Sequence, residues 1–373
     1  RKYRINSPAL RFHGFTDPWK PVTLGDVTFN FNRRNKECKE YPMYSVTNNR
    51  GFIPQNEQFE DREMVGEDIK SYKIIERGEF AYNPARINVG SIARYVGSEP
   101  CMISSLYVCF KPSNEVDGSF LLQFLKSPKA NFYYNANGEG GVRIYLFYPN
   151  FARIRTAIPS LSEQCKISSF LKLLDERIST QRRLIDKLET LIKGVRDLFI
   201  RKTISDGKWV KLGDICHITT GKLDANAMEE NGQYPFFTCA EKPFCINNYA
   251  FDTEALLISG NGANLGYINY YNGKFNAYQR TYVLDKFTED IQFIKIALQM
   301  LLPKRIAIEK STSNTPYIVQ STLSDMRIFI PSKDLQRRTT NLMLRLEEDM
   351  CVQTSLLASY NRMKSYLLQQ MFI

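Results

Sequence analysis

Two short segments have residue types that suit methyl transfer, but both lack essential parts. Asn83-Pro84-Ala85-Arg86 departs from the Asp/Asn-Pro-Pro-aromatic element that orients a target amine, because the second proline and the aromatic are missing. Ser259–Gly266 is glycine-rich and follows an apolar run, as a loop that binds S-adenosylmethionine would. The residues after Gly266 have a strand pattern, so no helix N-terminus is expected there. We therefore predict no catalytic residue and no cofactor in this chain.

Cysteine and histidine are too scattered for a metal site. The chain has eight cysteines without a Cys-x-x-Cys pair, and its two histidines are His13 and His217. A structural zinc site needs four close ligands, so we expect no metal. Unpaired thiols are typical of a reducing compartment, which favours the cytoplasm. No run of about 18 apolar residues indicates a membrane span.

The charge favours a polyanionic partner. The net charge is +11 over 373 residues, and the isoelectric point is near 9.1. Nucleic acid is the simplest such partner, and an inert basic surface is the alternative.

Arginine, lysine and amide side chains on expected loops could contact DNA. Arginine suits guanine edges or phosphates, and asparagine suits adenine. In the N-terminal part the candidates are Arg33, Arg34, Lys36, Arg50, Arg86, Asn88 and Arg94. In the C-terminal part they are Lys222, Asn264, Lys274, Tyr278, Gln279 and Arg280. For each one, an ordinary solvated side chain is the alternative.

A repeat indicates the elements that position these residues. IPSLSEQ at Ile158 and IPSKDLQ at Ile330 each precede a long helical pattern. Proline disfavours helix in the residue before it, so each helix is expected to begin just after it. Ser160 and Glu163 predict a capping box at the first helix, and Ser332 can cap the second. The first helix is expected from about Leu161 to Arg201.

Both helices have a heptad seam, which predicts an antiparallel coiled coil. The first seam is Ile167, Leu171, Leu174, Ile178, Gln181, Ile185, Leu188, Ile192, Val195 and Phe199. The second has polar breaks at Thr339 and Lys364. Gln181 and Gln353 occupy the same seam position, so they could form one polar layer that fixes the register; the alternative is that both face solvent.

Apolar residues outside the seams predict that the helices also bind protein. They are Phe170, Leu173, Leu184, Leu191, Leu198, Leu342, Leu344, Leu356 and Leu368. Burial against the globular parts of the same chain is the alternative.

The parts before the two helices also repeat each other. Leu24-Gly25-Asp26-Val27 corresponds to Leu212-Gly213-Asp214-Ile215, and Gly90 to Gly266. Alternating patterns predict strands, with a hairpin turn at Asn272-Gly273. We predict a mixed α/β (α+β) fold with pseudo-two-fold duplication. The expected domains are a first globe at 1–158, a helix at 159–203, a second globe at 204–330 and a helix at 331–373.

The chain resembles the DNA specificity subunits of type I restriction–modification systems. The resemblance rests on PALRFHGFTDPWKPVTLGDV near the start, SVTNNRGFI at Ser45, the IPSLSEQ helix opening, LLQQMFI at the end, and their order. It implies that each globe is a target-recognition domain for one half of an asymmetric, bipartite double-stranded DNA target. It also implies that the helices set the spacer and dock two methyltransferase subunits.

Further partners and cofactors follow from the same resemblance. Translocating endonuclease (restriction) subunits are expected to join the complex, and S-adenosylmethionine, ATP and Mg²⁺ to bind those partners. The specificity subunit itself is expected to be non-catalytic. A stand-alone nucleic-acid-modifying enzyme and a coiled-coil scaffold without DNA recognition are the alternatives.

Overall fold

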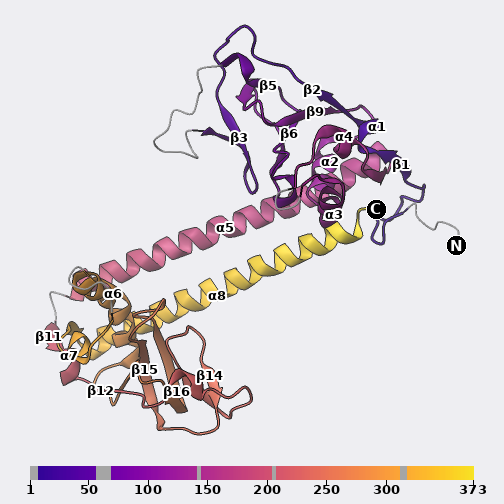
Figure 1. Cartoon of the computed structure of the whole chain (residues 1–373). Helices are drawn as coiled ribbons and strands as arrows, with labels where there is room; N and C mark the ends of the chain where they lie inside the picture. The colour runs from indigo at the N-terminus through magenta and orange to yellow at the C-terminus, as the bar shows by residue number, and fades with distance from the viewer. Residues whose placement is uncertain (1–6, 56–68, 141–143, 204–206, 311–316) are drawn as a thin grey trace. The chain divides into compact units, whose positions relative to one another are not determined.

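The structure is a computed structural model that describes residues 7–55, 69–140, 144–203, 207–310 and 317–373. It divides into two compact units. The first comprises Arg1–Arg182 and Ser355–Ile373, and the second comprises Arg183–Thr354. Each unit therefore contains one globe and the adjoining parts of two long helices, α5 (Leu161–Thr203) and α8 (Lys333–Gln370) (Figure 1).

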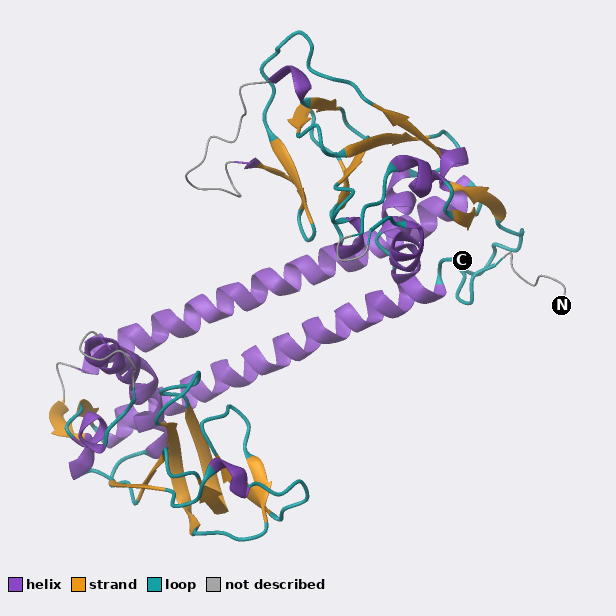
Figure 2. Cartoon of the chain, viewed as in Figure 1, coloured by secondary structure: helices purple, strands orange, loops and turns teal. Residues whose placement is uncertain are grey.

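The first globe consists of short strands and short helices (Figure 2). Its elements are β1 (Lys20–Thr23), α1 (Leu24–Val27), β2 (Thr28–Phe31), β3 (Tyr44–Thr47), β4 (Gly51–Pro54), η2 (Ile69–Ser71), β5 (Lys73–Ile75), β6 (Phe80–Tyr82), η3 (Ile87–Val89), β7 (Ile92–Arg94), β8 (Cys101–Ile103), β9 (Val108–Pro112), α2 (Gly118–Leu125), α3 (Pro128–Asn137), α4 (Tyr148–Ala152) and β10 (Arg155–Ile158).

The second globe has longer strands and one long helix. Its elements are β11 (Gly207–Lys211), η4 (Leu212–Asp214), β12 (His217–Thr220), η5 (Ala225–Ala227), β13 (Tyr234–Phe237), β14 (Phe244–Ile246), β15 (Phe251–Ser259), β16 (Ile268–Ala277), β17 (Thr281–Asp285), α6 (Ile291–Lys310), α7 (Gln320–Ser324) and β18 (Arg327–Pro331).

Both globes contain the same four-strand order. The first has the sheet β2-β9-β6-β7, and the second has β12-β17-β15-β16, extended by β13 and β14. Each globe also has a separate antiparallel pair next to its long helix, β1 with β10 and β11 with β18. The shared topology confirms the predicted mixed fold and its duplication.

The predicted hairpin turn at Asn272-Gly273 is wrong. Both residues lie inside β16, where Glu254 pairs with Asn272 and Thr253 with Gly273. Gly273 has a φ of 132°, a left-handed value that glycine adopts without a Cβ penalty. The Asn-Gly pair therefore lies within a continuous strand, and β15 and β16 are connected instead by the glycine-rich loop after Ser259.

The second sheet is buried on both faces. Leu256, Ile258 and Leu284 pack in a core with α6, whereas Ala255, Leu257 and Val283 pack in another with Phe237 and Phe275. Adjacent residues of a strand point to opposite faces, so these alternating positions fill two cores. The rigid sheet then supports the loops at its strand ends.

The Leu-Gly-Asp segments attach each globe to the strand pair next to its long helix, β1–β10 or β11–β18. We call this region of each globe its junction. The Leu24 N–H donates to Ile154 O at 2.9 Å, and the Leu212 N–H donates to Met326 O at 2.9 Å. Gly25 lies against Ala152 and Gly213 against Ser324: a Cβ on either glycine would come within 3.1 Å of the neighbour's Cβ. Close backbone packing thus explains the repeated glycine.

A buried glutamine connects the start of each long helix to its globe. Gln164 accepts from the Asp117 N–H at 2.7 Å and donates to Pro159 O at 2.9 Å. Gln336 accepts from the Asp290 N–H at 3.1 Å and donates to Pro331 O at 3.0 Å. Asp117 and Asp290 in turn cap α2 and α6. We call each set of bonds a glutamine clamp.

The predicted Ser160–Glu163 capping box is wrong, because Glu163 has other partners. Its carboxylate accepts from Arg11 Nε and Nη2, both at 2.7 Å, and from Trp19 Nε1 at 3.3 Å. The Glu163 side chain is 1% exposed and that of Arg11 14%. The hydrogen bond to Glu163 also raises the pKa of Arg11. At the second helix, Ser332 Oγ accepts from the Leu335 N–H at 3.4 Å, as predicted.

The two long helices pair in opposite directions within each unit. In the first unit, Leu174 and Ile178 of α5 share a core with Leu367 of α8, and Asp175 pairs with Lys364. In the second unit, Ile192 of α5 packs with Met343 of α8, and Arg196 pairs with Glu347 at 2.7 Å. The early part of α5 thus meets the late part of α8, and the reverse, which confirms the predicted antiparallel arrangement.

The polar layer of the coiled coil stays a prediction. Gln181 is buried, at 7% exposure, and Gln353 is half-buried. The two residues belong to different units.

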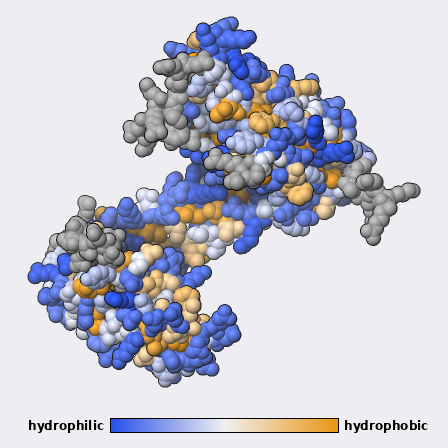
Figure 3. All heavy atoms as spheres, viewed as in Figure 1, coloured by the Kyte–Doolittle hydropathy of each residue, from blue (hydrophilic) through white to orange (hydrophobic). Residues whose placement is uncertain are grey.

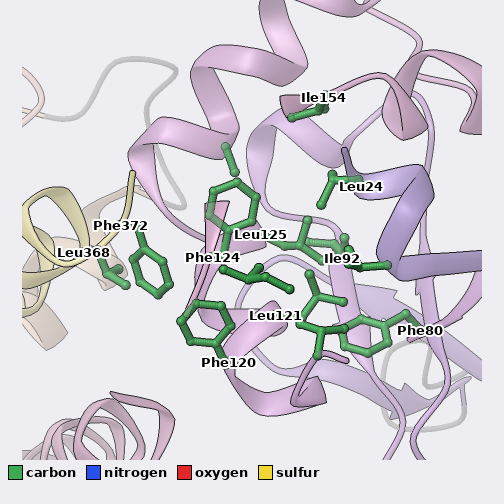
Figure 4. Close-up of a cluster of buried hydrophobic side chains, with 14 of the residues drawn as sticks. Leu24, Phe80, Ile92, Phe120, Leu121, Phe124, Leu125, Ile154, Leu368 and Phe372 are labelled. Carbon is green, nitrogen blue, oxygen red and sulfur yellow. The ribbon is translucent and has the colours of Figure 1, made fainter. Parts of the chain in front are cut away.

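The end of α8 and the residues that follow it complete the core of the first globe. Leu368 and Phe372 point into the cluster that contains Phe120 and Phe124 (Figure 4), and the Phe120 and Phe372 ring centroids are 5.3 Å apart. The expectation that Leu368 belongs to an outer protein-binding face is therefore wrong. It is 6% exposed, because the helix ends against the globe.

Candidate nucleic-acid interface

The turn between β3 and β4 presents polar side chains from a rigid base. Thr47 pairs with Gly51, and the three residues between them form the loop. Gly51, the first residue of β4, has a φ of 70°, a left-handed value that glycine adopts without a Cβ penalty. The Arg50 N–H donates to Thr47 Oγ1, and Thr47 Oγ1 to Gly51 O, both at 3.1 Å.

Arg50 is the predicted contact residue that lies on this turn. It is exposed and lines a polar cavity of about 490 Å³ together with Asn48, Asn83 and Arg86. It also lines a second cavity of about 610 Å³ with Arg94. Arginine and amide groups in a hollow have the donors and acceptors that base edges and phosphates need.

The remaining candidates of the first globe are dispersed. Arg33 forms ion pairs with Glu76 at 2.9 Å and with Glu79 at 2.8 Å, so its charge is used within the fold. Arg34 and Lys36 are exposed on the same loop. Asn88 donates to Asn135 at 3.2 Å. Arg94 donates to Ser119 at 3.0 Å.

In the second globe, the structure brings together most of the predicted residues. The Gln279 N–H donates to Leu223 O at 2.9 Å, next to Lys222, and the Gly260 N–H donates to Arg280 O at 2.8 Å. Asn264 Nδ2 donates to Cys239 O at 3.0 Å. Loops 221–223, 238–240, 260–266 and 278–280 therefore meet, and Lys222, Asn264, Tyr278, Gln279 and Arg280 share this one region.

Lys274 belongs to another region of the second globe. Its Nζ lies 4.6 Å from the centroid of the Tyr249 ring, and the hydrogen bond to Tyr249 raises its pKa. Lys274 was expected on a loop, but it lies within β16.

Several polar residues at these places were not among the predicted contacts. Asn48, Asn49 and Asn83 line the cavity with Arg50, and Asn261 accepts from Cys239 Sγ at 3.0 Å in the second region. The signal that could have found them is the position of asparagines in turns directly after predicted strands.

The described residues contain no group of three or more histidine, cysteine, aspartate or glutamate side chains that could hold a metal ion. Burial raises the pKa of the Cys101, Cys109 and Cys216 thiols to about 12. At neutral pH these thiols are protonated, and a protonated thiol is a poor nucleophile.

The long helices expose apolar side chains on the faces turned away from the seam. Leu173 is 65% exposed and Leu198 61%. Other exposed members of this set are Phe170, Leu184, Leu191, Leu342, Leu344 and Leu356. Figure 3 shows apolar patches at the surface along the helices. None of the helices among the described residues has the length and apolar character needed to cross a membrane.

Known proteins provide an independent comparison. The specificity subunit of the type I restriction enzyme EcoDI from Escherichia coli is 45% identical over 131 residues. This match covers 35% of the present chain and 29% of the relative, so it spans less than a third of that protein.

Two solved structures have a similar fold. The specificity (S) subunit of a type I restriction–modification system from M. genitalium superimposes with a TM-score of 0.65 at 15% identity, over 98% of this chain and 99% of that one. A structure from work on assembly and conformational transition of the type I restriction–modification system has a TM-score of 0.59 at 17% identity, over 96% and 99%.

A family model covers most of the sequence, in two copies. The model described as the type I restriction modification DNA specificity domain matches residues 16–190 and again residues 205–350. Each match covers most of one globe, whose common topology is described above, and the first part of the long helix that follows it. The chain therefore belongs to the family of type I restriction–modification DNA specificity domains.

Proposed function

We propose that the chain is the DNA-binding specificity subunit of a type I restriction–modification complex. The observation that carries this proposal is the duplicated family match on two globes with the same strand order. In each globe, at least part of the predicted contact set lies in a polar region at strand ends. The chain itself is proposed to be non-catalytic.

Each globe would recognise one half of a bipartite target. The loops differ between the globes: Arg50 and Arg86 lie in the first region, whereas Asn264, Gln279 and Arg280 lie in the second. Different donors and acceptors select different bases, so the two half-sites are expected to differ and the target to be asymmetric.

The partners are proposed to be double-stranded DNA, two methyltransferase subunits and the restriction subunits. The exposed leucines of α5 and α8 support protein docking, because apolar side chains in such number cost free energy in water. We also propose that helix length sets the spacer of the target. Insertion of one heptad in both helices should change the spacer and leave both half-sites unchanged, as read by methylation mapping.

Matched arginine variants test the contact sites. Arg50→Ala and Arg280→Ala should each relax specificity in one half-site only and cost about 1–3 kcal/mol of binding to the cognate duplex. Arg155→Ala and Arg327→Ala are the controls, because both arginines are exposed and lie on β10 and β18 at the junctions.

The readout is methylation mapping in cells that also contain the modification subunits, together with duplex binding in vitro. Binding without sequence preference in the wild-type complex would favour a coiled-coil scaffold. Methylation by the purified chain alone would favour a stand-alone enzyme.

A further inference from the structure

A third cavity lies next to the β3–β4 turn, inside the first unit. It has a volume of about 760 Å³, and its walls come from that turn, from α2, and from the paired stretches of α5 and α8. None of the predicted DNA-contact residues belongs to its helical walls. Arg50 is the one member of the predicted contact set that lines it.

The cavity is lined by an excess of positive charge. Lys126 follows α2, Arg182 lies on α5 and Lys364 on α8, and all three line the cavity with Arg50. The acidic residue of the lining is Asp175. Lys126, Arg182 and Lys364 against one carboxylate make the space attractive for an anion.

The single carboxylate does not neutralise this set. Asp175 forms an ion pair with Lys364 and accepts from Gln123 Nε2 at 3.0 Å. The described residues provide no ion pair for Lys126 or Arg182. Burial is the main cause of the lowered pKa of Lys126; the charge of Lys364 lowers this pKa further, and Asp175 acts to raise it.

The cavity also adjoins the polar cavity of the first globe. Asn48, Asn49 and Arg50 line both. A duplex whose bases meet the turn would therefore bring its backbone towards the cations of the helices.

We propose that this cavity binds a phosphate group of the DNA backbone beside the first half-site, through Lys126, Arg182 and Lys364. This inference rests on the proposed function. It assigns to the helix pair a direct part in DNA affinity, without any part in base recognition. Asp175 limits that affinity by reducing the charge of the site.

Two variants with opposite expected effects on DNA affinity test the inference in the full chain. Lys126→Gln should weaken binding to cognate and non-cognate duplexes by the same factor and reduce the slope of log affinity against log salt by about 0.9. Asp175→Asn should strengthen both and steepen the slope. Lys129→Gln is the matched control, because it removes the same charge three residues away, on α3, outside the cavity lining.

The result separates this inference from the proposed function. Unchanged affinity and slope in both variants, or a Lys126→Gln loss confined to the cognate duplex, would overturn the phosphate site even if Arg280→Ala still relaxes specificity. If the wild type shows no sequence preference, the proposed function fails. In that case, the slopes of log affinity against log salt for the wild type and the two variants, measured on any duplex, still show whether the cavity binds a phosphate.

A second experiment identifies the source of the phosphate. Duplexes with one neutral methylphosphonate linkage should reveal a position at which the wild type loses affinity and Lys126→Gln loses nothing further. Inorganic phosphate at constant ionic strength is the competing probe. If it stabilises the wild type but not Lys126→Gln, and no linkage position has an effect, a free phosphate ion is the ligand and the assignment to DNA is overturned.

Discussion

The two globe–helix junctions share one set of backbone contacts but differ in one buried charge. Both have the glutamine clamp, and both have a glycine packed against a short helix. Only the first has a buried carboxylate, Glu163, and its equivalent in the second repeat is the half-buried Leu335. The difference shows that the clamp suffices to join a globe to its helix, and that the Arg11–Glu163–Trp19 set has a separate role.

That separate role is to attach the N-terminal segment. Arg11 and Trp19 precede the first strand pair, and Glu163 binds both. In the second repeat, Trp209 is 51% exposed and packs its ring on Phe329 instead. The Arg11–Glu163 salt bridge therefore occurs at the junction where the N-terminal segment is fixed to the start of α5.

Removal of Glu163 gives the largest expected effect. Glu163→Ala removes the buried carboxylate and leaves the Arg11 guanidinium, whose side chain is 14% exposed, with the Asp17 carbonyl as its acceptor. The free energy of unfolding of the first unit should therefore fall by about 3 kcal/mol, the lower end of the range for a broken buried pair. Urea denaturation followed by tryptophan fluorescence measures it, because Trp19 is buried and Trp209 is exposed.

The second repeat provides the control for that experiment. Leu335→Ala, at the equivalent position, should cost no more than about 1 kcal/mol. The double variant Arg11→Met with Glu163→Leu should recover most of the loss, since no charge is then buried. Equal losses for Glu163→Ala and Leu335→Ala would show that the two junctions do not differ as described.

Substitution of the glutamine should destabilise both clamps by similar amounts. Gln164→Leu and Gln336→Leu each leave a partly buried N–H, that of Asp117 or Asp290, without its acceptor. Each variant should therefore cost about 1–3 kcal/mol in its own unit. Hydrogen exchange measured by mass spectrometry on the first turns of α2 and α6 locates the loss. If one of the two variants left the protection against hydrogen exchange unchanged, the clamps would not be equivalent.

The smallest expected effect is a difference in acid sensitivity between the clamps. Gln164 donates to a backbone carbonyl, Glu115 O, whereas Gln336 donates to the Glu289 carboxylate at 2.9 Å. Burial acts to raise the pKa of Glu289, but the hydrogen bonds from Lys333 and Gln336 outweigh it, and the net pKa is lowered. A carboxylate whose pKa is lowered by folding stabilises the fold at pH values above its pKa in the unfolded chain. This stabilisation is lost as the pH falls through the pKa of the folded state.

As the pH is lowered, protection against hydrogen exchange should therefore be lost at a higher pH in α6 than in α2. The difference should appear below about pH 4, near the ordinary pKa of glutamate. Glu289→Gln should remove the difference, and an α6 that is no more acid-sensitive than α2 in the wild type would contradict it.

The repeated elements were predictable from the sequence because short motifs carry them. IPS before a helix and Leu-Gly-Asp in a junction depend on contacts between residues close to the motif, so spacing alone locates them. The heptad seam was predictable for the same reason: Ile167, Leu171 and Leu174 are buried as the period requires.

The errors arose where distant residues decide the outcome. Glu163 binds Arg11, 152 positions earlier, and Leu368 enters a core formed by the first globe. Neither partner can be read from local spacing. The cavity proposed to bind phosphate has no signal in the sequence, because side chains such as Lys126 and Arg182 meet only after α2 and the two helices have come together.

The burial of Leu368 and Phe372 in the first globe has a consequence for synthesis on the ribosome. Domains near the N-terminus ordinarily fold while the remainder is still being translated. Here the globe that is translated first has to wait for side chains added more than 200 positions later than Phe120 and Phe124. Until then an apolar surface stays open on it, so nascent chains that stall before Leu368 should be substrates for chaperones.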